Sequence, residues 1–303
     1  IKIIKKLKNV STGSVFNNYN NLIKKIENYL SSSKINIPYC ENKVVKERLV
    51  QRIVELTCES YTKNIKSYEN DHNKENLNFI YLNGIKINHK TGKVDLSSKI
   101  YFYNFILFAI HWFLNFICVI ISFFNKSLKT SLPSTILMEA QGDYKDSDKN
   151  LVEFCKYGPI ASLRNASHII IKSKIKPKKQ SSQNIKYDNI PLHNILRNRL
   201  SFKDKFVILF ILLRGPFFFI KTSFCNPVSI LLAVDYVNLP LFKWLDKKKL
   251  IESINITTSS FMVQPLWLRS KTHFATNMIW YAQNLVPVIF KDEKFKVDHP
   301  FDK

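Results

Sequence analysis

A long uncharged segment, Tyr101–Phe124, constrains the fold of this chain more than any other feature of its sequence. It is mostly apolar, and it is longer than the roughly 20 residues with which an α-helix crosses a bilayer. Asn104, His111 and Asn115 interrupt it at spacings that place all three on one helical face. We expect this stripe to face protein. The segment predicts a membrane-associated helix, and a span, a surface-lying or re-entrant helix and a buried helix all remain open.

A second apolar stretch runs from Phe206 to Ile220 and is interrupted by Arg214-Gly215-Pro216. Lys205 and Lys221 bracket it, and the Gly-Pro pair predicts a broken helix. A broken apolar helix between cations suits the membrane interface better than a span. A soluble βαβ unit is expected between the two apolar stretches, so a two-span topology would have to translocate it. We therefore predict two helices that dip into one leaflet, with the protein peripheral or monotopic on the cytoplasmic face of the membrane.

The chain is strongly basic, with 46 Lys and Arg against 23 Asp and Glu, a formal net charge of +23. Such a charge attracts phosphate-rich partners, whether nucleic acid, anionic lipid or nucleotide-sugars. The excess is mostly Lys, whereas Arg is the residue suited to bidentate phosphate and base contacts. Abundant Lys, Asn and Ile also indicate a bias towards AT-rich codons. We expect an anionic membrane surface as a partner, and no specific nucleic acid.

Three regions are expected along the chain. Residues 1–75 form a helical N-terminal region, because apolar residues recur at helical spacing. Residues 76–130 comprise a β-hairpin, turning at Asn83-Gly84, and the apolar membrane-associated helix. Residues 131–303 alternate strand and helix, which predicts βαβ units and a parallel sheet. The expected class is α/β: a Rossmann-like parallel sheet with flanking helices, preceded by a small helical region and a β-hairpin.

Within residues 131–303 the patterns locate individual elements. Strands are expected at 134–140, 167–172, 253–258 and 277–281, and helices at 150–157, from Pro191 onwards, at 229–236 and at 239–250. The basic, Ser- and Asn-rich stretch 172–189 is expected to be an exposed loop.

Several catalytic classes are disfavoured by what the sequence lacks. Only six Gly occur, so neither a dinucleotide fingerprint nor a P-loop can be assembled, and the HExxH and Gly-x-Ser-x-Gly motifs are missing. The five Cys form no CxxC pair, and the His residues are dispersed. Kinases, dehydrogenases, serine hydrolases and zinc hydrolases are therefore disfavoured, and we expect no metal and no cofactor.

Polar clusters follow three expected strands, and in open parallel sheets ligands lie beyond the carboxyl ends of the strands. Hydroxyls, amides and aromatic rings are the usual groups that bind sugars. The candidate catalytic residues are Glu139 and Asp143. The candidate substrate-binding residues are Ser259, Ser260, Gln264, Trp267, Arg269, Tyr281, Gln283 and Asn284.

The same run carries a family resemblance. Residues 256–261, 264–267 and 278–284, which read ITTSSF, QPLW and MIWYAQN, resemble bacterial surface-polysaccharide biosynthesis proteins. Those proteins are similar to glycosyltransferases of the two-Rossmann-domain (GT-B) type. The resemblance covers roughly residues 132–303 and implies that this chain is mostly the N-terminal half of a longer protein. In that architecture the N-terminal domain meets a membrane-bound acceptor, and the C-terminal domain usually binds the nucleotide-sugar.

The sequence thus favours a glycosyltransferase-like enzyme that transfers a sugar from a nucleotide-sugar donor to a lipid-linked or saccharide acceptor. Glu139 or Asp143 would act as base, Arg269 would meet phosphate, and the hydroxyl and amide residues would bind sugar. The alternative is a non-enzymatic basic subunit of a membrane complex or an organellar ribosome.

Overall fold

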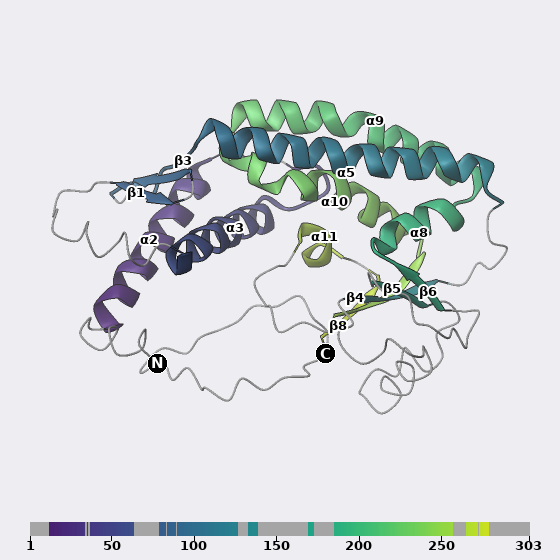
Figure 1. Cartoon of the computed structure of the whole chain (residues 1–303), viewed down its shortest axis with the longest axis horizontal. Coiled ribbons are helices and arrows are strands. Elements are labelled where there is room, and N and C mark those ends of the chain that lie inside the picture. Colours follow the sequence, from purple (N-terminus) through teal and green to yellow (C-terminus); the bar gives the residue numbers. More distant parts are fainter. Residues whose placement is uncertain are drawn as a thin grey trace. The chain divides into compact units, whose positions relative to one another are not determined.

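The computed structural model describes residues 12–33, 35, 37–63, 79–82, 84–88, 90–126, 133–138, 169–172, 185–256, 265–271 and 273–278. The chain divides into two compact units. One comprises Ile1–Ile110 with Gly215–Tyr236, and the other comprises His111–Arg214 with Val237–Lys303. Figure 1 labels the elements. The three-region division expected from the sequence remains a prediction.

Two helices form the N-terminal part of the first unit, α2 (Thr12–Ser32) and α3 (Asn42–Lys63). They pack together and bury apolar residues at helical spacing, as the sequence predicts. The buried residues are Leu22, Ile26 and Leu30 from α2 and Val45, Leu49 and Ile53 from α3.

A three-stranded antiparallel sheet follows, formed by β1 (Phe79–Leu82), β2 (Ile85–Asn88) and β3 (Val94–Leu96) in that order. Leu82 pairs with Ile85, so the predicted hairpin turn at Asn83-Gly84 is confirmed, and Gly84 has the positive φ of 83° that such a turn requires. The second turn closes when the N–H of Gly92 donates to the Asn88 carbonyl at 2.8 Å.

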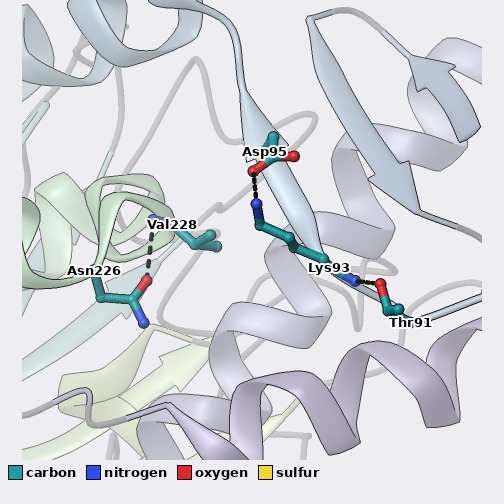
Figure 2. Close-up of polar contacts among 5 residues, drawn as sticks. All are labelled: Thr91, Lys93, Asp95, Asn226 and Val228. Carbon is teal, nitrogen blue, oxygen red and sulfur yellow. Dashed lines mark hydrogen bonds and ion pairs between the residues drawn. The ribbon is translucent and has the colours of Figure 1, made fainter.

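Short polar contacts fix the backbone near this sheet (Figure 2). The backbone N–H of Lys93 donates to the hydroxyl of Thr91 at 3.3 Å, and the Lys93 ammonium lies 3.3 Å from the Asp95 carboxylate. In the same unit, the N–H of Val228 donates to the side-chain oxygen of Asn226 at 3.2 Å. Asn226 thereby caps the 3₁₀ helix η2 (Pro227–Leu232).

The second unit contains a five-stranded sheet whose neighbours all pair in parallel, in the order β6-β5-β4-β7-β8. Its strands are β4 (Ser134–Met138), β5 (Ile169–Lys172), β6 (Ile185–Asp188), β7 (Ile251–Ile256) and β8 (Ala275–Met278). The predicted parallel sheet is confirmed, and with its flanking helices it makes the fold mixed α/β. A Rossmann-like arrangement remains a prediction.

The expectation of a loop over 172–189 is wrong at Ile185–Asp188, which forms the edge strand β6. The strand is short, and Ile185 is its buried apolar residue, so a basic and polar neighbourhood hides it in the sequence. Its pairing with β5 through four residues defines it instead. The expected helix 150–157 lies outside the described residues.

Six helices complete the described residues beyond β3: α5 (Ser98–Phe124), α8 (Pro191–Asn198), α9 (Phe202–Cys225), η2, α10 (Ala233–Lys247) and α11 (Leu266–Arg269). The predicted helix start at Pro191 is confirmed, because Pro at the first helical position loses no hydrogen bond. The two helices expected at 229–236 and 239–250 are not separate, because η2 ends at Leu232 and α10 runs unbroken from Ala233 to Lys247.

The predicted break in the second apolar stretch is wrong, because α9 continues through Gly215 and Pro216. Pro216 has no N–H, so the carbonyl of Leu212 loses its usual partner four residues later. The indole N–H of Trp112, from α5, donates to that carbonyl at 2.7 Å. A tertiary hydrogen bond thus replaces the one that proline removes, and the helix persists.

Helices α5 and α9 run side by side in opposite directions (Figure 1). In the first unit, the rings of Phe108 and Phe219 stack at 3.9 Å between centroids. In the second unit, the ammonium of Lys205 donates to the carbonyl of Ser122, and also to that of Asn125 at 3.4 Å. Lys205 therefore satisfies carbonyls at the C-terminal end of α5.

The polar stripe of α5 faces protein, as predicted. Asn104 and Asn115 are buried, and His111 is half-buried. The Asn104 amide donates to the Ile100 carbonyl at 2.9 Å, and the Asn115 amide donates to the side chain of Asn238 at 3.4 Å.

Three helices are long and apolar enough to cross a membrane: Ser98–Phe124, Phe202–Cys225 and Pro227–Lys247. The third is 72% buried in its most apolar window, so its apolar residues serve the protein core. The first two are only 28% buried and expose many large apolar side chains. Together they indicate that the protein associates with a membrane.

Candidate functional site: the carboxyl edge of the parallel sheet

Three neighbouring strands end in a single row. Met138, the last residue of β4, pairs with Ile256, the last residue of β7, and Ile256 pairs with Met278, the last residue of β8. The predicted polar segments 139–143, 257–264 and 280–284 follow these strands in the sequence. The strand order also changes direction between β4 and β7. The next strands in the chain after β4, which are β5 and β6, lie on one side of β4, whereas β7 lies on its other side and β8 lies beyond β7.

Most of the predicted site residues lie outside the described residues. These are Glu139, Asp143, Ser259, Ser260, Gln264, Tyr281, Gln283 and Asn284. The structure therefore describes only Trp267 and Arg269 of that set, and the roles assigned to all ten residues remain predictions.

Trp267 and Arg269 both belong to the short helix α11. Trp267 is buried, and its ring stacks on that of Phe242 with 4.0 Å between centroids and 10° between planes. One face of this indole is thus occupied by core packing, which leaves less of it for a sugar. Arg269 is half-buried, so its guanidinium keeps partial contact with solvent.

A row of hydrogen-bonded polar side chains crosses β4, β7 and β8. The Ser253 hydroxyl lies 3.4 Å from that of Thr135, and the Asn255 amide donates to the Ser253 hydroxyl at 3.3 Å. The amide of Asn277 donates to the side-chain oxygen of Asn255 at 2.9 Å. Thr135, Ser253 and Asn255 are fully buried, whereas Asn277 is half-buried.

This row of buried polar side chains is unusual, because a sheet covered by helices normally buries apolar residues. Buried polar groups must be hydrogen-bonded, and here each one orients the next. Asn255 and Asn277 each stand one position before a strand end. Their amides therefore lie close to the row of strand ends. Neither residue is among the site residues predicted from the sequence.

Asp246 anchors the start of β8. Its carboxylate is fully buried and accepts hydrogen bonds from the backbone N–H groups of His273 at 2.9 Å and Phe274 at 3.0 Å. Nearby, the ammonium of Lys271 donates to the hydroxyl of Thr276 at 2.6 Å. These bonds hold β8 in place beside β7 and so contribute to the alignment of their ends.

A second polar cluster surrounds α8, after the end of β6. The Asp188 carboxylate accepts the N–H of Ile190 at 3.0 Å, and Arg197 donates through Nε to the thiol sulfur of the buried Cys118 at 3.4 Å. That hydrogen bond raises the pKa of Arg197. Burial lowers the pKa of His193, the Arg197 charge lowers it further, and Asp188 acts in the opposite direction. His193 is therefore a buried imidazole that favours the neutral form.

His193 is not among the site residues predicted from the sequence. A signal was present, since His193 and Arg197 stand four residues apart on one helix, just after a strand-end aspartate. Within the described residues, no group of three or more His, Cys, Asp or Glu side chains could hold a metal ion.

Part of this chain matches a known protein family. Residues 218–301 match the family described as polysaccharide biosynthesis PFTS motif protein. No curated protein and no solved structure matches the chain significantly. The matched segment contains η2, α10, β7, α11 and β8. The match thus supports a role for this chain in polysaccharide biosynthesis.

Proposed function

We propose that this protein is a membrane-associated glycosyltransferase-like enzyme of surface-polysaccharide biosynthesis. It would transfer a sugar from a nucleotide-sugar to a lipid-linked or saccharide acceptor. One observation carries the proposal: the segment that matches the polysaccharide biosynthesis family contains β7 and β8, two of the three strands whose ends form the candidate site.

The order of the sheet supports the same proposal. Counted along the chain, its five strands lie in the order 3-2-1-4-5. This is the order found in doubly wound nucleotide-binding sheets, in which ligands bind beyond the strand ends at the point where the order reverses. Here that point lies between β4 and β7, the strands that precede Glu139 and Ser259 in the sequence. We therefore propose that this sheet and its helices form a Rossmann-like domain.

The proposed chemistry uses residues from all three segments. Glu139 or Asp143 takes the proton of an acceptor hydroxyl, and the resulting oxygen attacks the anomeric carbon of the donor sugar. The bond between that carbon and the donor phosphate breaks, and the nucleotide leaves with the electron pair. Arg269 stabilises the phosphate charge. The sugar is held by Ser259, Ser260, Gln264, Trp267, Tyr281, Gln283 and Asn284.

The test is donor turnover by the purified full chain in lipid micelles. Nucleotide-sugars of the uridine, guanosine and thymidine classes are supplied with a membrane lipid extract as acceptor, and release of nucleotide is measured. We expect either Glu139→Gln or Asp143→Asn to slow release at least about 100-fold, the usual contribution of a general base. Asn277→Ala should raise the donor or acceptor concentration needed for half-maximal rate. Asn21→Ala, an exposed change on α2, is the matched control.

Two results would contradict these assignments. Full turnover by both Glu139→Gln and Asp143→Asn would remove the base from the proposal. Absence of turnover with every donor, together with co-purification of ribosomal RNA or a large stable complex, would favour the non-enzymatic subunit.

A further inference from the structure

The exposed face of α9 carries a line of three cations. Lys203, Arg214 and Lys221 are all exposed, and they are separated by eleven and seven residues. At about 3.6 residues per turn, these separations correspond to about three and two full turns. The three side chains therefore project from one side of the helix along almost its whole length.

An aromatic stripe lies beside the cation line on the same helix. Its most exposed members are Phe202, Phe206, Phe210, Phe217 and Phe224, with 53–80% of each residue accessible to solvent. Phe202 and Phe206 pack edge-to-face against Phe123 of α5, at 5.9 and 5.2 Å between ring centroids. The stripe thus adjoins α5, and the cation line lies on its far side.

The exposed face of α5 extends the apolar surface. Between Lys99 and Lys126 this helix has no charged residue, and its exposed side chains include Phe102, Phe113 and Phe124. On α5 the apolar band thus lies between cations at the two ends, and on α9 it lies beside a line of cations. An apolar centre with basic borders matches the profile of a leaflet, in which acyl chains lie beneath negatively charged phosphates.

The position of Arg214 argues against α9 as a span. Arg214 lies at the middle of Phe202–Cys225, is exposed, and places its guanidinium 4.1 Å from the ring centroid of Phe210. A charge at the bilayer centre is strongly disfavoured unless it is paired, and the neighbouring helix α5 contains no acidic residue. Although α9 is long and apolar enough overall to cross a membrane, Lys205, Arg214 and Lys221 divide it into uncharged runs much shorter than the roughly 20 mostly apolar residues of a span.

We infer that α9 lies in the plane of an anionic leaflet and does not cross it. The aromatic stripe enters the acyl region together with the exposed face of α5, and Lys203, Arg214 and Lys221 contact lipid phosphates. The net charge of +23 acts in the same direction by drawing the chain to an anionic surface. This inference is independent of the sugar-transfer proposal, because docking requires no turnover.

The first test asks on which side of a bilayer the two ends of α9 lie. Cys225, at the C-terminal end of α9, is an exposed free cysteine. One variant retains Cys225 as its single cysteine, and a second carries Lys203→Cys alone, with all native cysteines replaced by Ser. Each is labelled with a membrane-impermeant maleimide in sealed vesicles. We expect both ends to react from the same side. Labelling from opposite sides would establish a span and overturn the inference.

The second test asks whether the cation line reads lipid charge. Full-length protein is mixed with vesicles of phosphatidylcholine, with or without 30% phosphatidylglycerol, and sedimented. The K203Q/R214Q/K221Q variant should bind the anionic vesicles about 100-fold more weakly, since each cation near the surface strengthens binding severalfold. The control K43Q/K90Q/K247Q removes the same charge from exposed sites elsewhere and should change binding less than about threefold.

Equal losses of vesicle binding in both triple variants would show that only net charge matters. That result would overturn the inference that Lys203, Arg214 and Lys221 contact lipid phosphates. A stable dimer, cross-linked through Phe113 or Phe217 positions in the absence of lipid, would assign the face to a second copy of the chain instead. Circular dichroism of each variant verifies that the fold is retained.

Discussion

At the scale of single residues, the fold depends on polar atoms that find partners far along the chain. Trp112 donates to the carbonyl that Pro216 leaves without its helical partner, and Asp246 accepts two backbone N–H groups at the start of β8. Each of these bonds satisfies a buried group that would otherwise be costly. Their loss should therefore be measurable as a change in the free energy of unfolding.

Trp112→Phe should destabilise the protein by about 1–3 kcal/mol, because it leaves the Leu212 carbonyl without its donor. In a Pro216→Ala background, the new N–H of Ala can bond that carbonyl, so the same change should cost about 1 kcal/mol less. Chemical unfolding in detergent, followed by circular dichroism, gives the four free energies of this cycle. If Trp112→Phe lowers the free energy of unfolding equally in both backgrounds, the indole does not compensate for the N–H that Pro216 lacks.

His193 should make stability depend on pH. Its pKa in the folded protein lies below 6.5, its ordinary value, chiefly because it is buried. The unfolded chain therefore takes up the proton first as the pH falls. The stabilisation is full above about pH 6.5 and is lost as the pH falls from there through the lowered value. His193→Gln should reduce the loss of unfolding free energy between about pH 7.5 and pH 5.5. Chemical unfolding of the wild type and the variant at both pH values measures this difference.

At the scale of elements, the ends of α5 and α9 are tied to each other. The Ser201 hydroxyl accepts the N–H of Asp204 at 3.3 Å and donates to its carboxylate at 2.5 Å, which caps the start of α9. One residue later, Lys205 donates to the last carbonyls of α5. The start of one helix and the end of the other are therefore stabilised by neighbouring side chains.

Lys205→Met should destabilise the protein by about 1–3 kcal/mol, since it keeps the apolar stem but removes a buried ammonium from the carbonyl end of α5. Lys203→Met changes an exposed side chain two residues earlier and should alter stability by less than about 0.5 kcal/mol. Thermal unfolding of both variants in the same detergent provides the comparison. Similar effects at the two positions would show that the carbonyl contacts contribute little.

At the scale of the whole molecule, apolar composition has two different uses. The helices α5 and α9 expose many apolar side chains. The stretch Pro227–Lys247 is also long and apolar enough to cross a membrane, but 72% of its most apolar window is buried in the protein. Hydropathy alone does not distinguish a helix that contacts lipid from a helix in the protein core, because both remove apolar area from water.

A photoactivated apolar label dissolved in the bilayer should distinguish them. We expect mass spectrometry to find labelled peptides from Ser98–Phe124 and Phe202–Cys225, and little label in Pro227–Lys247. Protein unfolded in denaturant before labelling is the control that exposes all three. Comparable labelling of the third stretch in the native protein would mean that it also contacts lipid.

The sequence by itself determined the elements whose cause is local. Leu22, Ile26 and Leu30 recur at helical spacing, Asn83-Gly84 suits a tight turn, and the apolar run that ends Ser134–Met138 suits a buried strand. Periodicity and turn chemistry act between near neighbours, so they can be read without the rest of the chain. The expected protein-facing stripe at Asn104 and Asn115 follows from the same geometry.

Only the tertiary structure decided what depends on partners distant in sequence. Pro216 predicts a break, yet the indole of Trp112 lets α9 continue. The edge strand β6 exists through its pairing with β5. The row of Met138, Ile256 and Met278 likewise required the strand order, since no local pattern specifies which strands lie side by side. The apolar segment Tyr101–Phe124 predicts membrane contact from its composition alone, because composition decides how much apolar area must be buried away from water. Which face of the helix contacts the membrane depends on the side chains that the rest of the fold covers.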